Sequence, residues 1–246
     1  MSENIRYERL SDSVTAAQDE RGLILTSDAC LLAAFVSKNA KNRICELGAG
    51  SGIISLMLLE RKKIRSSVCL DVQADMCRIA AENAESNGCA DKMTAVCSDV
   101  LDYKTDRLFD AVVCNPPYFK SGDGKKNARK EDELCRHETT AGIDDFALCA
   151  SRILKDGGAA YFCYTPGRAA DLYVALRSAG LEPKTELYVY PTVKHKPSLL
   201  LVGAKKGAKS GLTCCKPLFL YKNGPGEELT EEYIKIKESM SIEILK

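Results

Sequence analysis

The sequence predicts an α/β fold: a doubly wound, mostly parallel, seven-stranded sheet of the Rossmann-like type, with helices on both faces and the last strands antiparallel. From residue 43 to 204, short apolar runs alternate with amphipathic stretches, as strands alternate with helices in such folds. The 246 residues suffice for one large domain with appendages, since a domain has roughly 150 residues. Apolar residues are 45% and charged residues 28% of the chain, which excludes disorder, collagen and coiled coil.

The first half of this region predicts strands over 43–47, 67–72, 93–97 and 110–114, and helices over 51–61 and 74–87. The helix over 74–87 carries its apolar residues on one face, at the period of an amphipathic helix. Gly88 is its expected stop, because glycine readily adopts the left-handed conformation that ends a helix.

The second half predicts helices over 144–154 and 168–179 and strands over 159–164, 187–190 and 198–202. The helix over 144–154 is expected to have Asp144 or Asp145 as its N-cap and Gly157-Gly158 as its stop. The last two strands are expected to pair in antiparallel fashion. The chain then divides into an N-terminal cap (1–42), a core (43–204) and a C-terminal extension (205–246).

The charge balance excludes some classes of partner. Lys and Arg number 35 and Asp and Glu 34, so the net charge is +1, which excludes a histone-like or strongly acidic binder but not a local basic patch. No run approaches the ~18 apolar residues of a membrane span. The first residues lack the apolar core of a signal peptide, so a cytoplasmic location is expected.

The twelve cysteines do not predict a metal site. There is no CxxC pair, and the only histidines are His137 and His195, so the ligand spacings of a zinc site are missing. Most of the cysteines stand singly in apolar runs and are expected to be small buried residues in a reducing compartment: Cys45, Cys69, Cys97, Cys114 and Cys163. The adjacent pair Cys214-Cys215 has no assigned role.

A glycine turn follows the first strand. Gly48, Gly50 and Gly52 form a GxGxG pattern, which lets the backbone turn sharply and lets a ligand lie against it. The dinucleotide fingerprint would need glycine at position 53, where Ile53 stands. Glu46 just before the turn would repel a phosphate and attract a cationic amino-acid group.

Two further acids end the next two strands. Asp71 lies 19 residues past Gly52, where a carboxylate can accept both hydroxyls of a ribose. Asp99 ends the third strand, where it can accept the amino group of an adenine. With Glu46, these acids describe a ligand that has a ribose, an adenine and a cationic amino-acid part, as S-adenosylmethionine has. The alternative is that each carboxylate caps a helix.

The fourth strand runs into Asn115, Pro116, Pro117 and Tyr118. Because proline has no N–H to donate, the Asn115 side-chain oxygen and the Pro116 carbonyl can accept both hydrogens of a planar amine. Tyr118 offers a face on which a base can stack. Held in line, the amine nitrogen can attack a methyl group without a metal. The alternative is a proline turn that ends a strand.

The stretch from about residue 22 to 204 resembles a class I S-adenosylmethionine-dependent N-methyltransferase, and it is most similar to the bacterial tRNA(Val) adenine-37 N6-methyltransferase family. The matching features are Thr26-Ser27-Asp28 with Leu31-Leu32, the turn from Glu46 to Gly52, Asp71, Asp99, Asn115 to Tyr118, and Arg136-His137-Glu138. The resemblance implies that Thr26 and Asp28 close over the methionine end of S-adenosylmethionine.

Two basic segments indicate a nucleic-acid partner. The loop 120–136 has six basic and four acidic residues, and a structural role is favoured for His137 beside it. Between Glu186 and Glu227 there is no acid, but there are His195 and seven lysines: Lys194, Lys196, Lys205, Lys206, Lys209, Lys216 and Lys222. A basic block on such a core is typical of a nucleic-acid footprint. The alternative is a solvated lysine surface.

These observations favour an enzyme that methylates the N6 amine of adenine in RNA, with a tRNA anticodon loop as the expected substrate. The main alternative is a protein glutamine N5-methyltransferase that acts on a release factor, because an amide can use the same Asn-Pro-Pro-Tyr site. A DNA adenine methyltransferase is disfavoured, since no second domain could read a duplex. A non-catalytic donor-binding subunit is disfavoured by the intact motif. The sequence does not predict an oligomeric state.

Overall fold

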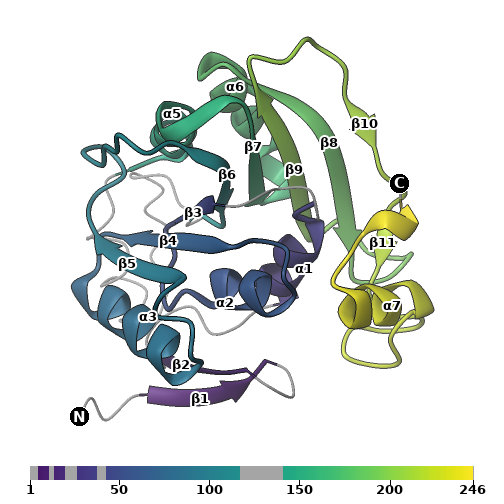
Figure 1. Cartoon of the computed structure of the whole chain (residues 1–246). Coiled ribbons are helices and arrows are strands. Elements are labelled where there is room, and N and C mark those ends of the chain that lie inside the picture. Colours follow the sequence, from purple (N-terminus) through teal and green to yellow (C-terminus); the bar gives the residue numbers. More distant parts are fainter. Residues whose placement is uncertain (1–4, 11–13, 20–26, 38–42, 117–140, 246) are drawn as a thin grey trace, which may run out of the picture.

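A mostly parallel sheet forms the centre of the molecule, as predicted (Figure 1). The computed structural model describes residues 5–10, 14–19, 27–37, 43–116 and 141–245. The nine strands of this sheet are β3 (Arg43–Leu47), β4 (Ser66–Asp71), β5 (Met93–Cys97), β6 (Phe109–Cys114), β7 (Leu154–Tyr164), β8 (Leu181–Tyr190), β9 (Leu199–Lys206), β10 (Thr213–Cys214) and β11 (Leu218–Phe219). The strand order is β10-β8-β9-β7-β6-β3-β4-β5, and β11 also pairs with β8.

The seven predicted strands are β3 to β9. β9 is antiparallel to both of its neighbours, β7 and β8, so the predicted antiparallel pairing of the last two strands is confirmed. β8 therefore runs in the same direction as β3 to β7, and β9 is the strand that is reversed among these seven. The short strands β10 and β11, which were not predicted, add to β8 in parallel.

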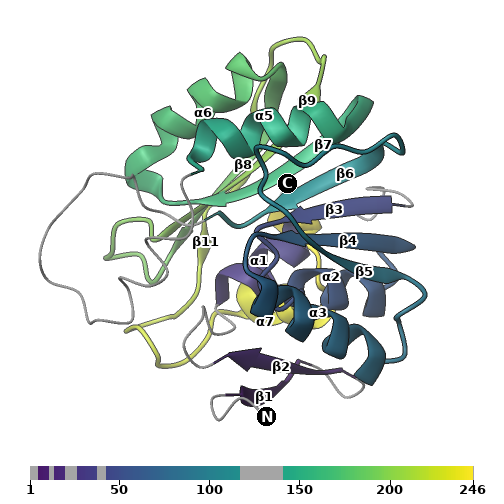
Figure 2. The ribbon, with the colours of Figure 1, turned by 90° about the vertical axis from the view of Figure 1, so that its left-hand side faces the viewer.

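Helices cover both faces of the sheet (Figure 2). Their bounds are α1 (Ser27–Phe35), α2 (Ile53–Glu60), α3 (Ala74–Ser86), α5 (Ile143–Ile153), α6 (Ala169–Ser178) and α7 (Glu231–Ser239), with short 3-10 helices at Pro166–Arg168 and Glu243–Leu245. α1, α2, α3 and α7 lie on one face, and α5 and α6 lie on the other. Each face has its own apolar core, which confirms the doubly wound architecture.

The predicted ends of the helix at 144–154 are wrong. Its N-cap is Gly142, and Asp145 lies one turn in, where its carboxylate accepts a hydrogen bond from the Gly142 N–H at 2.8 Å. The helix ends because Leu154 is already extended and begins β7. Gly157 and Gly158 therefore lie within β7, at a shift in its register with β6, and Gly157 has a left-handed φ of 71°.

The first residues of the described chain form a hairpin, β1 (Ile5–Arg9) and β2 (Thr15–Asp19). Two asparagine side chains of the α3 region hold β2 much as a neighbouring strand would. Asn83 exchanges two hydrogen bonds with the backbone of Ala17, at 2.7 and 2.9 Å, and Asn87 exchanges two with Thr15, at 3.1 and 2.8 Å. The hairpin is thus attached to α3 by polar contacts.

α1 packs into the apolar core, since its Leu31, Leu32 and Phe35 are buried. Its C-terminal carbonyls accept hydrogen bonds from a buried ammonium: Lys63 Nζ donates to Ala33, Ala34 and Val36 at 2.8, 3.1 and 2.7 Å. A cation at a helix C-terminus is favourable because the last carbonyls carry partial negative charge.

Burial of the cysteines was predicted correctly at Cys45, Cys69, Cys114 and Cys163, and all described cysteines are free thiols. The prediction is wrong at Cys97, which is exposed because it ends β5, the strand at the edge of the sheet. Within the described ranges, no helix is long and apolar enough to cross a membrane, and no group of three or more His, Cys, Asp and Glu is arranged to hold a metal ion.

Candidate active site

The predicted site residues follow strands that end at one edge of the sheet, which we call the carboxyl edge. Leu47 at the end of β3 pairs with Leu70 on β4 and with Cys114 on β6, and Asp71 pairs with Cys97 on β5. The residues that come next along the chain therefore meet at this edge. Ligands of doubly wound sheets bind there.

The glycine turn has a backbone that other residues adopt only with strain. Gly48, Gly50 and Gly52 all have left-handed φ values, of 63°, 53° and 75°. A Cβ on Gly52 would lie 2.2 Å from the Met93 Cε atom, so this position also lacks space for a side chain. A Cβ on Gly50 would meet no atom within 4 Å. The turn is thus packed at Gly52 and open at Gly50, where a ligand has room to approach the backbone.

Asp71 connects the glycine turn to the ends of β4 and β5. Its Oδ2 accepts a hydrogen bond from Gly50 N–H at 2.7 Å, and its Oδ1 accepts one from Gln73 N–H at 3.0 Å. Its own carbonyl accepts from Ser98 N–H at 2.9 Å. Burial raises the pKa of the carboxyl, and the backbone donors oppose that rise. Each carboxylate oxygen can accept a second hydrogen bond, so capacity for a ribose remains.

Glu46 lies in the core, and its carboxylate faces the first turn of α2. Oε2 accepts hydrogen bonds from the Ser55 N–H at 2.9 Å and from the Ser55 hydroxyl at 2.6 Å. Burial raises the pKa of Glu46 to about 7, although the Ser55 donors oppose this. The geometry is that of a carboxylate at a helix N-terminus, which was the alternative interpretation of this residue. Its charge also lies at the start of the glycine turn.

Two further predicted acids are half-buried. Asp99 follows β5, and its Oδ1 accepts a hydrogen bond from Leu101 N–H at 2.9 Å, which fixes the turn after the strand. Asp28 lies in the first turn of α1, where burial raises the pKa of its carboxyl and the Ser27 hydroxyl opposes that rise. No hydrogen bond between described residues joins Asp28 to the glycine turn. Thr26 lies outside the described residues.

The acceptor motif begins where β6 ends. Asn115 is half-buried and Pro116 is buried, and both follow Cys114, which pairs with Leu47 at the start of the glycine turn. The first half of the motif is therefore next to the predicted donor site. Pro117, Tyr118, His137 and the basic loop 120–136 lie outside the described residues.

Asn83, which the sequence analysis did not single out, holds the glycine turn by a hydrogen bond from α3. Its Nδ2 donates to the Ser51 carbonyl at 2.9 Å while the same side chain holds β2, and the residue is 2% exposed. The available signal was its position: Asn83 shares the apolar face of α3 with Ile79 and Ala80. A polar residue on a buried helix face requires partners, which here are backbone groups.

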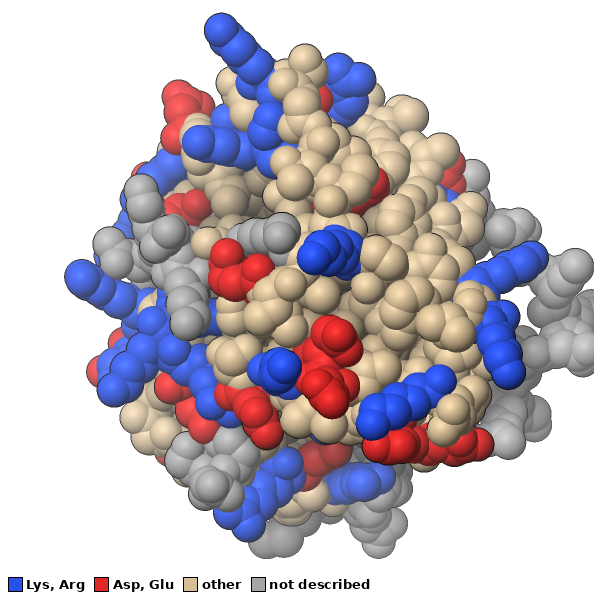
Figure 3. All heavy atoms as spheres, turned by 90° about the vertical axis from the view of Figure 1, so that its right-hand side faces the viewer, with Lys and Arg blue, Asp and Glu red and all other residues tan. Residues whose placement is uncertain are grey.

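The lysines of the basic block predicted between Glu186 and Glu227 lie at two opposite edges of the sheet. Lys206 pairs with Leu181, the first residue of β8, so it lies at the edge opposite the carboxyl edge. Its Nζ donates to the Ser151 and Leu154 carbonyls at 2.8 and 2.9 Å, so it caps the C-terminal end of α5. Lys194 belongs to the connection after β8, at the carboxyl edge. On the face that carries β8, β10 and α7, positive side chains are interspersed with negative and uncharged ones (Figure 3).

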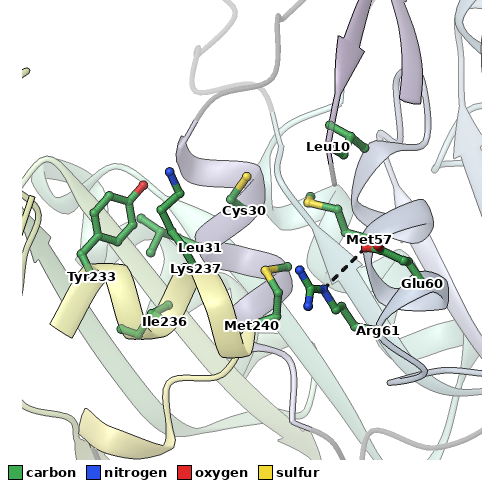
Figure 4. A pocket seen from close by; sticks show the side chains of 10 residues that line it. All are labelled: Leu10, Cys30, Leu31, Met57, Glu60, Arg61, Tyr233, Ile236, Lys237 and Met240. Carbon is green, nitrogen blue, oxygen red and sulfur yellow. Dashed lines mark ion pairs between the residues drawn. The ribbon is translucent and has the colours of Figure 1, made fainter. Parts of the chain in front are cut away.

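A cavity of about 80 Å³ lies between α1, α2 and α7 (Figure 4). Its lining is mostly apolar, with the ion pair between Arg61 and Glu60 on one side. The lining residues are Leu10, Cys30, Leu31, Met57, Glu60, Arg61, Tyr233, Ile236, Lys237 and Met240. None of the predicted site residues lines it, so we do not assign the predicted chemistry to this cavity.

Comparisons with known proteins agree with this architecture. The methyltransferase small domain family matches residues 26–135. The tRNA1(Val) (adenine(37)-N6)-methyltransferase of Vibrio campbellii is 28% identical over 143 residues, which are 58% of this chain and 59% of the relative. The enzyme of the same name from Actinobacillus pleuropneumoniae serotype 7 is 30% identical over 166 residues, which are 67% and 69% of the two chains. The matched part thus spans 59% of the first relative's length.

A crystal structure of a predicted O-methyltransferase, Atu636 from Agrobacterium tumefaciens, has a TM-score of 0.68 and 24% identity to this chain, and covers 87% of this chain and 97% of its own. This likeness shows the fold. Together with the carboxyl-edge geometry and the family match, it defines a Rossmann-like methyltransferase of the S-adenosylmethionine-dependent class. Within that class, the chain belongs to the family of the tRNA1(Val) (adenine(37)-N6)-methyltransferases.

Proposed function

We propose that this protein transfers a methyl group from S-adenosylmethionine to the exocyclic N6 amine of an adenine in tRNA, in the anticodon loop. The observation that carries the proposal is the position of Asn115 and Pro116, directly after β6 and beside the glycine turn that Asp71 holds. The activity for which the two relatives are named, methylation of adenine 37 in tRNA1(Val), supports the same nucleobase. A tRNA substrate implies a cytoplasmic enzyme.

On the donor side, the residues present fit a nucleoside with an amino-acid group. Open space at Gly50 accommodates a ligand against the backbone, and Asp71 is positioned to accept the ribose hydroxyls. Asp99 is assigned to the adenine amine, and the negative charge of Glu46 attracts the amino-acid ammonium. Gly48 and Gly52 shape the turn, and Thr26 and Asp28 are assigned to the methionine end. S-adenosylmethionine would supply an electrophilic methyl on a sulfonium; as the N–C bond forms the S–C bond would break, S-adenosylhomocysteine would leave, and the amine would release one proton to solvent.

On the acceptor side, Asn115 and Pro116 orient the target amine. The side-chain oxygen of Asn115 and the carbonyl of Pro116 accept its two hydrogens, and the nitrogen lone pair is then directed toward the methyl carbon. An adenine amine is a weak nucleophile because its lone pair is delocalised into the ring. Fixed acceptors that stabilise the charge developing on nitrogen lower the barrier without a metal or a covalent intermediate. Pro117 and Tyr118 are assigned to the same pocket, with Tyr118 as the stacking partner of the base.

The test is methylation of unmodified tRNA by the purified protein, with mass spectrometry of the nucleosides. We expect N6-methyladenosine that maps to the anticodon loop. Methylation of a release-factor peptide in place of tRNA would instead establish a glutamine methyltransferase. Absence of any methylated nucleoside, with S-adenosylmethionine bound, would contradict the proposal.

A variant at Asn115 separates chemistry from donor binding. Asn115→Ala should lower kcat by about 10²–10³, the loss seen when one fixed transition-state partner is removed. Calorimetry should find S-adenosylmethionine affinity near that of the wild type, because Asn115 is assigned to the acceptor. Turnover close to that of the wild type would show that another group positions the amine.

A further inference from the structure

The connection between β8 and β9 forms a fixed, positively charged turn at the carboxyl edge. Thr192 is fully buried, and its Oγ1 lies 2.7 Å from His195 Nδ1 and accepts a hydrogen bond from Lys194 N–H at 3.2 Å. The Thr192 carbonyl accepts from His195 N–H at 3.1 Å. These contacts hold the backbone of residues 192–196, which we call the 192–196 turn, while the side chains of residues 193–196 are exposed.

Within the described part of the chain, no acid neutralises the two lysines of this turn. Val193, Lys194, His195 and Lys196 are all exposed, and Val193 is 69% exposed. Among the described residues, no acid forms an ion pair with Lys194 or Lys196. Some other cations of the described chain are paired, such as Lys222 with Glu228 and Arg168 with Asp171. The 192–196 turn thus presents two ammonium groups to a ligand, beside the exposed imidazole that Thr192 orients.

The sheet register fixes the position of this turn relative to the acceptor motif. Cys114 on β6 is level with Phe162 on β7, Val202 on β9 and Glu186 on β8. Asn115 is thus three strands away from β8, roughly 14 Å, and the turn begins about five residues, or roughly 16 Å, further along the chain from β8. The turn and Asn115 are therefore roughly 20 Å apart on the same edge of the sheet.

We infer that the 192–196 turn is the contact through which this protein holds the RNA backbone on one side of the target adenine. This inference rests on the proposed function. A distance of roughly 20 Å is too long for contact with the reacting base but suits phosphates several nucleotides away. Lysine ammonium groups bind phosphates as point charges, and a turn fixed by Thr192 loses little conformational entropy when it binds.

Lys205 and Lys209 provide the matched control. Both are exposed lysines of the same basic block. In the strand register, Lys205 on β9 lies opposite Glu182, near the start of β8 and at the opposite edge of the sheet. Lys209 follows β9 at the same edge. Replacing both lysines of either pair by glutamate changes the net charge by the same amount. A difference between the two variants therefore depends on where the lysines lie.

The experiment measures tRNA methylation and donor affinity in three proteins: the wild type, Lys194→Glu with Lys196→Glu, and Lys205→Glu with Lys209→Glu. We expect the first double variant to raise KM for tRNA about tenfold or more at low salt, with kcat nearly unchanged. Loss of two phosphate contacts should flatten the slope of log affinity against log salt by about 1.4–1.8. The second variant should stay close to the wild type, and S-adenosylmethionine affinity should be equal in all three.

Two further outcomes are distinguishable. If the wild type methylates tRNA but both double variants raise KM equally, the inference is wrong and the effect is one of net charge. If the wild type methylates no tRNA, the proposed function itself fails. Lys194→Arg with Lys196→Arg should retain wild-type KM, since arginine also binds phosphate. Failure of this rescue would show that the turn acts through something other than charge.

Discussion

The carboxylates at the carboxyl edge each serve the fold as well as the proposed reaction. Glu46 accepts hydrogen bonds from the first turn of α2, and Asp71 accepts them from the glycine turn and from Gln73. Both pKa values are raised by burial. A carboxylate that is buried without a cationic partner costs stability when it ionises. A cationic ligand that enters this site would reduce that cost, so ligand binding and ionisation should be coupled.

Glu46→Gln tests this cost through its pH dependence. The folded pKa of about 7 exceeds the ordinary 4.5, so between these values the folded state binds more protons than the unfolded chain. The wild type should therefore lose stability as pH rises through this window, by about 3 kcal/mol in total. The amide of the variant cannot ionise and still accepts from Ser55, so the variant should not show this loss. Denaturant unfolding from pH 4 to 8 measures the difference.

The same variant should bind S-adenosylmethionine more weakly above pH 7, because the negative charge assigned to the donor ammonium is gone. A more stable protein with lower donor affinity is the expected combination. Parallel stability curves for the two proteins would show that Glu46 ionises at its ordinary pKa. Unchanged donor affinity in the variant would show that Glu46 does not contact the donor.

Asp71→Ala should abolish measurable donor binding and lower the free energy of unfolding by about 1–3 kcal/mol. The ribose hydroxyls lose their acceptor, and the backbone N–H groups of Gly50 and Gln73 lose theirs. Asp75→Ala is the control, since Asp75 is an exposed acid four residues on, at the start of α3. Calorimetry and thermal unfolding measure the two effects. Donor affinity in Asp71→Ala equal to that of the control would contradict the donor assignment.

At the scale of elements, the parts that could be predicted are those whose position follows from chain order. In a parallel sheet the strand ends meet at one edge, so the glycine turn, Asp71, Asp99 and Asn115 could be placed together from their distance along the chain. The contacts of Asn83 with Ala17 and of Lys63 with α1 join elements far apart in sequence. No local pattern encodes such pairings, and β10 and β11, which pair with the earlier strand β8, were missed for the same reason.

Asn83→Ala should destabilise the protein and weaken donor binding together. The Ala17 backbone and the Ser51 carbonyl would lose their partners in a buried site, at a cost of about 1–3 kcal/mol. Ser51 belongs to the glycine turn, so the donor site should loosen as well. Asn87→Ala is the matched control: it also holds β2 but is more exposed, so water can replace it. Equal effects of the two variants on donor affinity would contradict a positioning role for Asn83.

At the scale of the whole molecule, both ends of the described chain join one core. Val14 and Ala16 of the hairpin region, and Ile236 and Leu245 of the C-terminal region, belong to the same apolar cluster as α1 and α2. α7 lies on α1, and the Arg61 guanidinium at the end of α2 donates to the Glu238 carbonyl at 3.4 Å. The division of the chain at residues 42 and 205 stays a prediction, but this packing favours one cooperative unit.

Ile236→Ala tests whether the C-terminal segment unfolds with the rest. Ile236 is 1% exposed between α7 and the core, so the change should cost about 2–5 kcal/mol and lower the melting midpoint by about 4–20 °C. Ile234→Ala on the same helix is the control, because Ile234 is 40% exposed and should shift the midpoint little.

Two optical signals report whether the C-terminal segment unfolds with the rest: far-ultraviolet circular dichroism follows the backbone, and near-ultraviolet tyrosine signals follow packing. We expect both signals to shift together, since α7, α1 and the sheet share one core. A separate early transition, with the main midpoint unchanged, would show that residues 205–246 fold as an independent appendage.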